Sequence, residues 1–489
     1  MSLYDLALLS SLQNSRSKGN FSEFMERETG YTWDGTPEGK IALLEHFGNT
    51  FTSDSDQGVI KKLETDLIPI LARMEVAGVK LDTKKLEKIG IEISEKIKLL
   101  EIEIFELTGE FFNISSPKQV AEILFGKLGI KPTKKNKTGY SVDTEVLEEI
   151  AKEYMVADLI IQHRSLSKLQ STYVESLLKI VDKKSHRVHT TYHQLGAATG
   201  RMSSNDPNLQ NIPTGIGYAS DIKSCFIPSD IDHILIVADY SQIEIRVLAW
   251  LSEDRALLSA FQNEEDIHMR TAKFLFGDDF SITSEQRRVA KTVNFGVIYG
   301  ITGFGLSKTL GVPPHEATNY IHAFYEKYPG VRMYYDAILE EARKNGYVET
   351  AFGRRRSIPG VNDANKTIRS ISEREAVNMP IQGTAADMIK LAMCDIDERI
   401  RDEYLDGKMI LQVHDELVFD VPKSEEGIFR KIIQECMEGV LKKHEKKIIS
   451  EYSTLSGELS HSGFSDNHPS HLPLIVDIHS GENWIEAKG

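Results

Sequence analysis

The chain has few cysteines and no long apolar run. Its 489 residues include 3 cysteines, Cys225, Cys394 and Cys436, and their wide spacing fits neither a disulfide framework nor a zinc site. No segment has the length and apolar character of a membrane span, and the first residues lack the basic stretch and apolar core of a secretory signal. We therefore expect a protein of a reducing compartment with no membrane partner.

The sequence also lacks an excess of positive charge. It carries 58 Lys and Arg residues against 73 Asp and Glu residues, which gives a formal net charge of −15. A polyanionic ligand would therefore need a local basic surface, because the chain as a whole repels it. Basic residues cluster at 134–137, 183–184 and 354–356, and each cluster can equally be a solvated loop.

Two aspartates follow short apolar runs in distant parts of the chain. Asp239 ends the run 234–239, and Asp415 comes just after the run 410–413. Runs of this kind fill buried strands. An Asp after a strand is commonly a turn residue or a helix cap, but two carboxylates at one sheet edge repel each other unless cations lie between them. Since Mg²⁺ favours a few carboxylates combined with phosphate oxygens, the pair indicates metal-assisted phosphoryl transfer.

One predicted helix carries a divided face. Its side chains at four-residue steps are Arg287, Lys291, Phe295 and Tyr299. On an α-helix they form a stripe about 18 Å long, cationic at its start and aromatic at its end. A nucleoside triphosphate has the matching polarity, because cations bind phosphates and rings stack on a base. The alternative is an ordinary amphipathic helix that buries its rings.

These segments resemble DNA polymerase family A, the bacterial polymerase-I-like group, in its large-fragment form. The motifs that carry the resemblance are DYSQIEIR at 239–246, RRVAKTVNFGVIYG at 287–300, VHDEL at 413–417, TGRMSSNDPNLQNIP at 199–213, EDIH at 265–268 and NMPIQGTAAD at 378–387. Segments 112–119 and 137–143 resemble the family's thumb. The similarity runs in the family's order from about residue 65 onward, with one interruption near 446–470, and long ordered motifs are specific.

The resemblance implies an α+β fold of the right-hand polymerase type, with an antiparallel palm sheet and helical fingers and thumb. The expected domains are a short N-terminal segment at 1–64 (a degenerate or truncated exonuclease remnant), the thumb at 65–185, the first part of the palm at 186–250, the fingers at 251–364 and the second part of the palm at 365–489. A polar insertion near 446–470 interrupts the last part. We interpret it and the nearby His461, His468 and His471 as a flexible Ser- and His-rich loop rather than a metal site.

The resemblance also implies a catalytic set. Asp239 and Asp415 would hold two Mg²⁺ ions, for which Mn²⁺ can substitute, with the backbone carbonyl of Tyr240 as a further ligand. Glu416 would support the site rather than bind metal tightly. Lys291 would bind phosphate and is the candidate to protonate pyrophosphate.

Further residues would form the nucleotide pocket. Phosphate binding is expected of Arg287, Lys291 and His268, although His268 taken alone fits a helix-face histidine. Phe295, Tyr299 and Gln242 would complete the pocket. Glu244 would lie under the sugar and exclude a 2′-hydroxyl, which favours DNA over a single-subunit RNA polymerase.

A last set would contact primer-template DNA. Arg201, Gln382, His414 and Asn211 match the family's DNA-binding positions. Donors at such positions can sense the shape of a base pair, because minor-groove acceptors occur at similar places in all correct pairs. Gln382 can otherwise be a polar cap before a helix that starts near Thr384.

We therefore expect a monomeric, template-directed DNA polymerase that adds deoxynucleotides to a primer 3′-hydroxyl and releases pyrophosphate, with no protein partner deducible. Residues 1–64 lack a paired Asp-x-Glu signature, so neither a 3′–5′ nor a 5′ nuclease is expected. The expected location is cytoplasmic, nucleoid-associated in a bacterium, with an organelle or an infected host cell still open. Efficient copying of RNA, or primer-template binding without catalysis, are the alternatives.

Overall fold

A computed structural model describes residues 58–136, 139–194, 196–213, 215–277, 281–444 and 472–489. The expectations for residues 1–57 and for the 446–470 insertion with its histidines lie outside these ranges. Within them, no helix is both long and apolar enough to cross a membrane.

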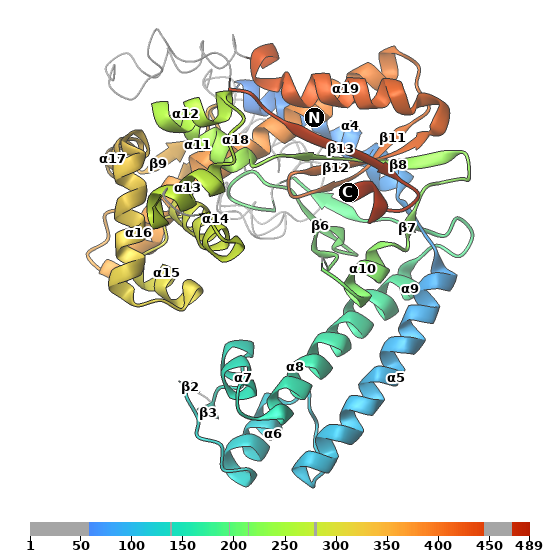
Figure 1. Ribbon diagram of the computed structural model, residues 1–489. Coiled ribbons are helices and arrows are strands. Elements are labelled where there is room, and N and C mark those ends of the chain that lie inside the picture. Colours follow the sequence, from blue (N-terminus) through green and yellow to red (C-terminus); the bar gives the residue numbers. More distant parts are fainter. Residues whose placement is uncertain (1–57, 137–138, 195, 214, 278–280, 445–471) are drawn as a thin grey trace, which may run out of the picture.

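Four antiparallel strands form the central sheet, in the order β11-β12-β8-β13 (Figure 1). Their bounds are β8 His233–Tyr240, β11 Lys408–Val413, β12 Glu416–Pro422 and β13 Val476–Gly481. On β8, Ile236 and Ala238 join one core cluster, whereas Leu235 and Val237 join another. Because side chains alternate along a strand, burial on both faces explains the unbroken apolar run before Asp239.

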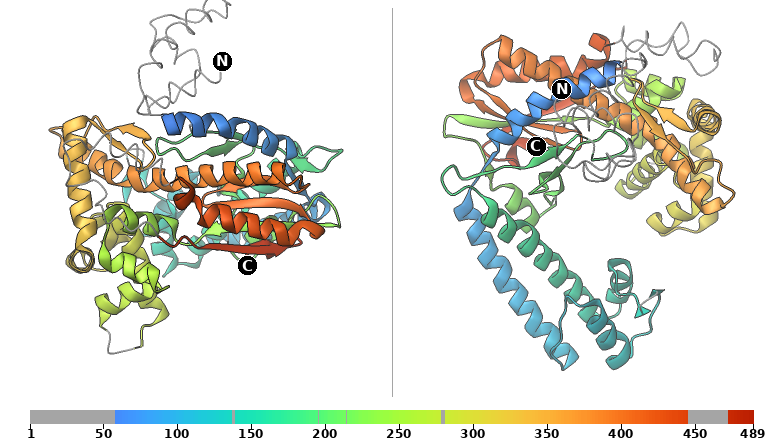
Figure 2. Two further views of the ribbon diagram at one scale, coloured as in Figure 1. Left: turned by 90° about the horizontal axis from the view of Figure 1, so that it is seen from above. Right: turned by 180° about the vertical axis from the view of Figure 1, so that it is seen from behind.

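Three long helices cover one face of this sheet (Figure 2). They are α4 Gly58–Ala77, α18 Lys366–Asp402 and α19 Glu426–Glu438. Helix α18 runs without a break through Pro380, so the predicted helix start near Thr384 is wrong. A proline inside a helix costs about 3 kcal/mol, and here the burial of the flanking residues Met379 and Ile381 outweighs that cost.

A helical arm projects from the sheet (Figure 1). It begins after Asp82, whose side chain accepts a hydrogen bond from the backbone N–H of Lys85, and its first helix ends before Gly109, which has φ +65°. The outer part of the arm has its own apolar core around Ile104 and Leu124, whereas its base, with Leu86, shares an apolar cluster with Val237 of the sheet. Its elements are α5 Thr83–Thr108, α6 Pro117–Ala121, η2 Glu122–Lys127, β2 Lys135–Asn136, β3 Gly139–Tyr140, α7 Thr144–Ala151, α8 Met155–Lys168, η3 Leu169–Glu175 and α9 Ser176–Ile180.

Short elements connect the arm to the sheet. A three-stranded sheet, β4-β1-β7, lies at the base of the arm. These elements are β1 Val79–Leu81, β4 Arg187–Val188, β5 Thr191–His193, β6 Ser203–Asn205, η4 Leu209–Asn211, α10 Tyr218–Lys223 and β7 Phe226–Ile227.

A second helical group lies on the other side of the sheet from the arm's base (Figure 1). It shares the larger apolar core with α18. Its elements are α11 Ile243–Ser252, α12 Arg255–Gln262, α13 Ile267–Phe276, α14 Ser284–Ile298, α15 Gly303–Leu310, α16 Pro314–Lys327, α17 Pro329–Asn345, β9 Tyr347–Glu349 and β10 Arg355–Ser357.

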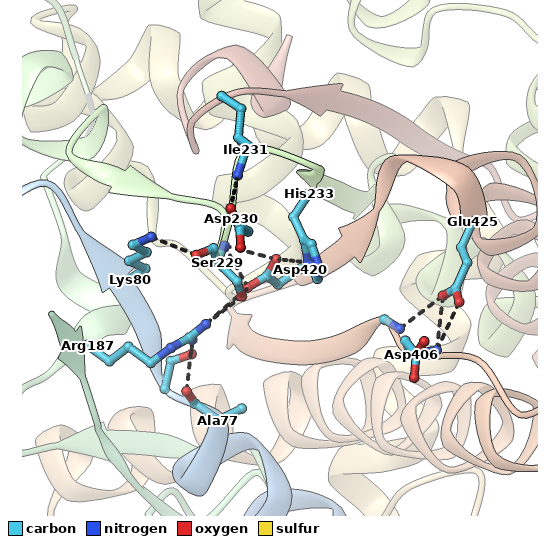
Figure 3. A network of polar contacts seen from close by, with 12 residues as sticks. Ala77, Lys80, Arg187, Ser229, Asp230, Ile231, His233, Asp406, Asp420 and Glu425 are labelled. Atoms are coloured by element: carbon cyan, nitrogen blue, oxygen red, sulfur yellow. Dashed lines mark hydrogen bonds and ion pairs between the residues drawn. The ribbon is translucent and has the colours of Figure 1, made fainter. Parts of the chain in front are cut away.

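A buried carboxylate fixes the base of the arm to the central sheet (Figure 3). Asp420 on β12 is 3% exposed. It accepts hydrogen bonds from the Ser229 backbone and hydroxyl, pairs with His233 Nδ1 at 2.9 Å and lies 3.4 Å from Arg187 Nη2. Arg187 also donates to the carbonyl of Ala77 at the end of α4. One buried anion therefore connects β12, β4 and α4.

Helix α4 contributes an acidic residue to a buried ionic cluster. Glu64 is fully buried, and its carboxylate accepts hydrogen bonds from Arg354 at 2.5 Å, Lys390 at 2.6 Å and Gln194 at 2.9 Å. Arg354 also binds Asp387 at 2.7 Å. Burial by itself would raise the pKa of Glu64, but Lys390 and Arg354 outweigh burial and lower that pKa. The expected boundary at residue 64 thus falls inside a helix that is integral to the fold.

This cluster corrects the interpretation of residues 354–356 as a surface for phosphates. Arg354 is 5% exposed, so it is available neither to DNA nor to solvent. Arg355 pairs with Glu349, and Arg356 lies 3.1 Å from Glu375. The three cations are adjacent in the sequence, and in the structure each of them pairs with a carboxylate.

We expect Glu64→Gln to destabilise the protein by about 3 kcal/mol, because it leaves buried cations without their counter-charge. Lys62→Gln on the same helix is the matched control. It removes only the exposed ion pair with Asp66, which contributes less than about 1 kcal/mol. Urea unfolding of both variants measures the difference, and equal stabilities would contradict this role for the cluster.

Candidate functional site

The pairing of β8 with β12 brings the two predicted aspartates to one edge of the sheet. Glu416, the first residue of β12, lies directly opposite Asp239. Asp415 therefore occupies the turn beside the end of β8, and its carbonyl accepts a hydrogen bond from the Tyr240 N–H at 3.2 Å. The strand register alone places both carboxylates at the same end of neighbouring strands.

The turn that carries Asp415 is held in an unusual conformation. His414 has φ +53°, a left-handed backbone conformation that is costly for residues other than glycine. The Gln412 side chain donates to the His414 carbonyl at 2.5 Å, and Gln210 in turn donates to the Gln412 side chain at 2.9 Å. The sequence patterns did not single out either glutamine. For Gln412, the available signal was a polar residue within the apolar run 409–413.

Both aspartates line a cavity of about 420 Å³. The Asp239 side chain is 41% exposed and that of Asp415 is 28% exposed. Burial raises the pKa of Asp415 to about 6, Arg201 opposes this effect, and the charges of Glu244 and Asp239 add to it. Burial also raises the pKa of Asp239, with Lys488 opposing. The two carboxylates therefore lie where additional positive charge would stabilise their ionised forms.

The donor set of this cavity fits a hard divalent cation. Its acidic lining residues are Asp239, Asp415 and Glu416, of which Glu416 is 2% exposed, and carboxylate oxygens suit Mg²⁺ or Mn²⁺. In the part of the chain that the structure describes, no group of three or more His, Cys, Asp or Glu side chains is arranged to hold a metal ion. A cation here would therefore need oxygens from backbone, water or phosphate, which is how Mg²⁺ is commonly bound.

The Glu416 carboxylate is buried and already hydrogen-bonded, so it is less available as a metal ligand than the two aspartates. It is 2% exposed. Trp484 Nε1 donates to one oxygen at 2.6 Å, and Lys488 Nζ lies 2.5 Å from the other. The expectation of a supporting role fits these contacts. Neither Trp484 nor Lys488 was predicted from the sequence.

A chain of polar contacts connects the aspartates to α14. Arg201 Nη2 lies 3.9 Å from Asp415 and 2.5 Å from Glu244. The second oxygen of Glu244 accepts a hydrogen bond from the Tyr299 hydroxyl at 2.6 Å. Asn378 on α18 donates to the Tyr299 carbonyl at 3.3 Å. The last turn of α14 is thus fixed to both α11 and α18.

The stripe on α14 is not buried as an ordinary amphipathic helix would place it, although Phe295 packs against the larger apolar core. Lys291 and Tyr299 are exposed, whereas Arg287 and Phe295 are half-buried. The rings of Phe295 and Tyr299 are nearly parallel, at 25°, with centroids 6.4 Å apart. Arg287 Nε and Nη2 both donate to Asp266 Oδ2, at 2.9 and 2.7 Å. The predicted order of cations followed by rings is therefore present on an accessible surface.

His268 is buried, unlike an exposed phosphate ligand. It is 3% exposed, and its ring lies 5.7 Å from that of Phe295. Asn294 donates to its Nδ1 at 2.9 Å, in an orientation fixed by the bond from the Thr271 hydroxyl to the Asn294 oxygen. Burial lowers the pKa of His268 to about 4. At neutral pH it is therefore uncharged and can offer only an Nε2–H donor.

The remaining predicted residues lie around these groups. Gln242 has φ +55° at the start of α11, and its side-chain oxygen is buried without a hydrogen-bond partner. Asn211 ends η4 and lines the cavity of the aspartates together with His414. Gln382 is half-buried on α18, one turn after Asn378. The structure therefore does not place Gln382 as a helix cap.

Comparisons with known proteins agree with this architecture. The sequence description of DNA polymerase family A matches residues 83–486. DNA polymerase I of Bacillus caldotenax is 42% identical over 449 residues, and that of Bacillus subtilis (strain 168) is 44% identical over 449 residues; each match covers 91% of this chain and 48% of the relative. The chain thus spans about half the length of the curated relatives it matches.

A solved structure is similar over almost the whole chain. It is the POL domain of Pol1 from M. smegmatis in complex with DNA primer-template and dNTP, with a TM-score of 0.87 and 31% identity, covering 99% of this chain and 82% of that one. The expected α+β fold of the right-hand polymerase type is confirmed. By the family match and by the identity to its relatives, this chain belongs to DNA polymerase family A.

Proposed function

We propose that this chain is a template-directed DNA polymerase that adds deoxynucleotides to a primer 3′-hydroxyl and releases pyrophosphate. One observation supports the proposal most strongly: two carboxylates at one sheet edge are connected through Arg201 and Glu244 to an exposed helix face of cations and rings. Phosphoryl transfer depends mainly on positioning and on charge stabilisation. This arrangement provides both within one connected network.

In the proposal, Asp239 and Asp415, with the Tyr240 carbonyl, hold two Mg²⁺ ions, for which Mn²⁺ can substitute. When bound, such ions lower the pKa of the attacking hydroxyl and neutralise charge on the triphosphate. Glu416 supports the pair through its bonds to Trp484 and Lys488.

The cationic half of the α14 stripe binds the triphosphate. Arg287 donates through Nε and Nη2 to a single oxygen of Asp266, and a guanidinium can bind phosphate oxygens with the same two nitrogens. Lys291 is exposed and is positioned as a point charge and as the donor of a proton to pyrophosphate. His268 adds a neutral N–H donor.

The aromatic half of the stripe forms the pocket for base and sugar. Phe295 and Tyr299 offer stacking surface, and Gln242 has an unpaired buried oxygen that can accept a hydrogen bond. Glu244 is held by Arg201 and Tyr299, so its carboxylate cannot move aside for a ribose 2′-hydroxyl. This rigidity is the proposed basis for selecting deoxynucleotides.

Primer-template DNA lies, in this proposal, between the thumb (65–185) and the helical group as fingers (251–364), over the palm (186–250 and 365–489). Within the predicted thumb, the arm covers 83–180, whereas residues 65–77 belong to α4 on the central sheet. Arg201, Gln382, His414 and Asn211 contact the nascent pair and the primer end. The enzyme acts as a cytoplasmic monomer. Residues 1–64 of this sequence contribute no 3′–5′ or 5′ nuclease site in this proposal, since they hold no Asp-x-Glu pair.

Asp239→Ala should abolish primer extension while primer-template binding persists, because the carboxylate serves the chemistry and not the hold on DNA. Extension is measured with Mg²⁺ and a labelled primer, and binding by fluorescence anisotropy. Asp232→Ala, an exposed position just before the same strand, should retain full activity. Continued extension by Asp239→Ala would contradict the assignment of the site.

Glu244→Ala should raise ribonucleotide incorporation relative to deoxynucleotide by about tenfold or more, since the obstacle to a 2′-hydroxyl is removed. Single-nucleotide extension with matched rNTP and dNTP gives the ratio. Tyr299→Phe loses the same hydrogen bond but keeps the carboxylate, and its ratio should change less. Unchanged sugar discrimination in Glu244→Ala counts against this role.

Affinity for primer-template DNA should fall at least about a hundredfold between 50 and 200 mM salt, because binding to phosphates releases counterions. The net charge of −15 makes local contacts indispensable. Anisotropy titrations over a salt series provide the slope, and an affinity independent of salt is incompatible with phosphate-based binding.

A further inference from the structure

Three acidic side chains lie in one row across the central sheet. Asp239 on β8 is directly opposite Glu416 on β12 and Asp477 on β13. Residues directly opposite each other share a face of the sheet, and like charges in that position are destabilising. The row therefore requires positive charge even before a metal ion or a nucleotide arrives.

Lys488 supplies such a charge. Its Nζ lies 2.5 Å from Glu416 and 4.0 Å from Asp239. Lys488 belongs to the 3₁₀ turn η6 (Glu486–Lys488), which folds back against the sheet after β13. A Cβ at Gly481 would lie 2.4 Å from the backbone N of Ala487, so glycine is needed for this close return.

Lys488 and Trp484, which precedes η6, contact both oxygens of the Glu416 carboxylate. Trp484 Nε1 donates to one oxygen and Lys488 Nζ to the other. Trp484 is itself 1% exposed, packs edge-on against Phe226 with centroids 5.3 Å apart, and has the Lys223 ammonium 4.2 Å above its ring. Glu416 lines the same cavity as the two aspartates, but each of its oxygens already has a donor that competes with a cation for it.

We propose that Lys488 is a positioning residue that sets how tightly Asp239 and Asp415 bind a divalent cation. Its ammonium keeps Glu416 out of the coordination shell of the ion and weakens the negative potential at Asp239. Without this charge, Glu416 becomes an additional ligand and the cavity attracts cations more strongly. The inference rests on the proposed function in one respect, namely that the two aspartates bind a divalent cation.

Binding of Mn²⁺ to the full chain, without DNA or nucleotide, tests this directly. Free Mn²⁺ is followed by its electron paramagnetic resonance signal, so the readout is independent of polymerase activity. Lys488→Gln should tighten binding on the order of tenfold, since a positive charge close to a ligand oxygen is lost. Lys488→Arg retains the charge and should bind Mn²⁺ as the unmodified chain does.

Two further variants provide the controls. Glu416→Gln in the Lys488→Gln background restores the local net charge and removes the extra ligand, so it should reverse the tightening. Lys423→Gln removes only the exposed pair with Glu482 at 2.8 Å and should change nothing. Thermal unfolding of each variant checks that the fold is intact.

The inference would be overturned if Lys488→Gln left the Mn²⁺ affinity unchanged or weakened it. It would also be overturned if Lys488→Arg tightened Mn²⁺ binding as much as Lys488→Gln does. Asp239→Ala separates this failure from a failure of the proposed function. If Asp239→Ala abolishes Mn²⁺ binding and Lys488→Gln leaves it unaffected, only the role of Lys488 is contradicted. Binding that survives Asp239→Ala contradicts the metal site itself, and this inference with it.

Discussion

Carboxylates from three strands or turns meet at one edge of the central sheet, and nearby cations have to offset their mutual repulsion. The register of β8 and β12 fixes Asp239 opposite Glu416 and places Asp415 in the adjoining turn. A shift of this register by one residue would reverse every side chain of β8 and move Asp239 away from Glu416 and Asp415. The surrounding cations, Arg201 and Lys488, are then explained by the charge that the sheet brings together.

Glu244 connects these charged residues to the proposed nucleotide pocket. It is 4% exposed and binds Arg201 with one oxygen and Tyr299 with the other. Arg201 in turn lies beside Asp415. A group proposed to sense the sugar is therefore two contacts away from the proposed metal site. Any movement of Tyr299 at the end of α14 has to break or stretch a bond in this chain, which connects the position of the helix to the geometry of the carboxylates.

Local patterns in the sequence predicted the features that depend on local periodicity. The apolar runs before Asp239 and Asp415 are strands of one sheet, and the four-residue steps from Arg287 to Tyr299 lie on one face of α14. The patterns failed where a residue depends on a distant partner. Arg354 looked like a surface cation, because its buried partner Glu64 is 290 residues away along the chain. The alternative of a helix start near Thr384 also failed, because α18 is continuous from Lys366 to Asp402. No motif indicated the contact of Lys488 with Glu416.

The central claim is that Asp239 and Asp415 share divalent cations in front of the cationic end of α14. Anomalous diffraction from crystals grown with Mn²⁺, primer-template DNA and a non-hydrolysable deoxynucleotide analogue tests it most directly. The account predicts anomalous peaks between these two carboxylates, with the triphosphate against Arg287 and Lys291. Mn²⁺ bound elsewhere, or a triphosphate that does not reach α14, would contradict it.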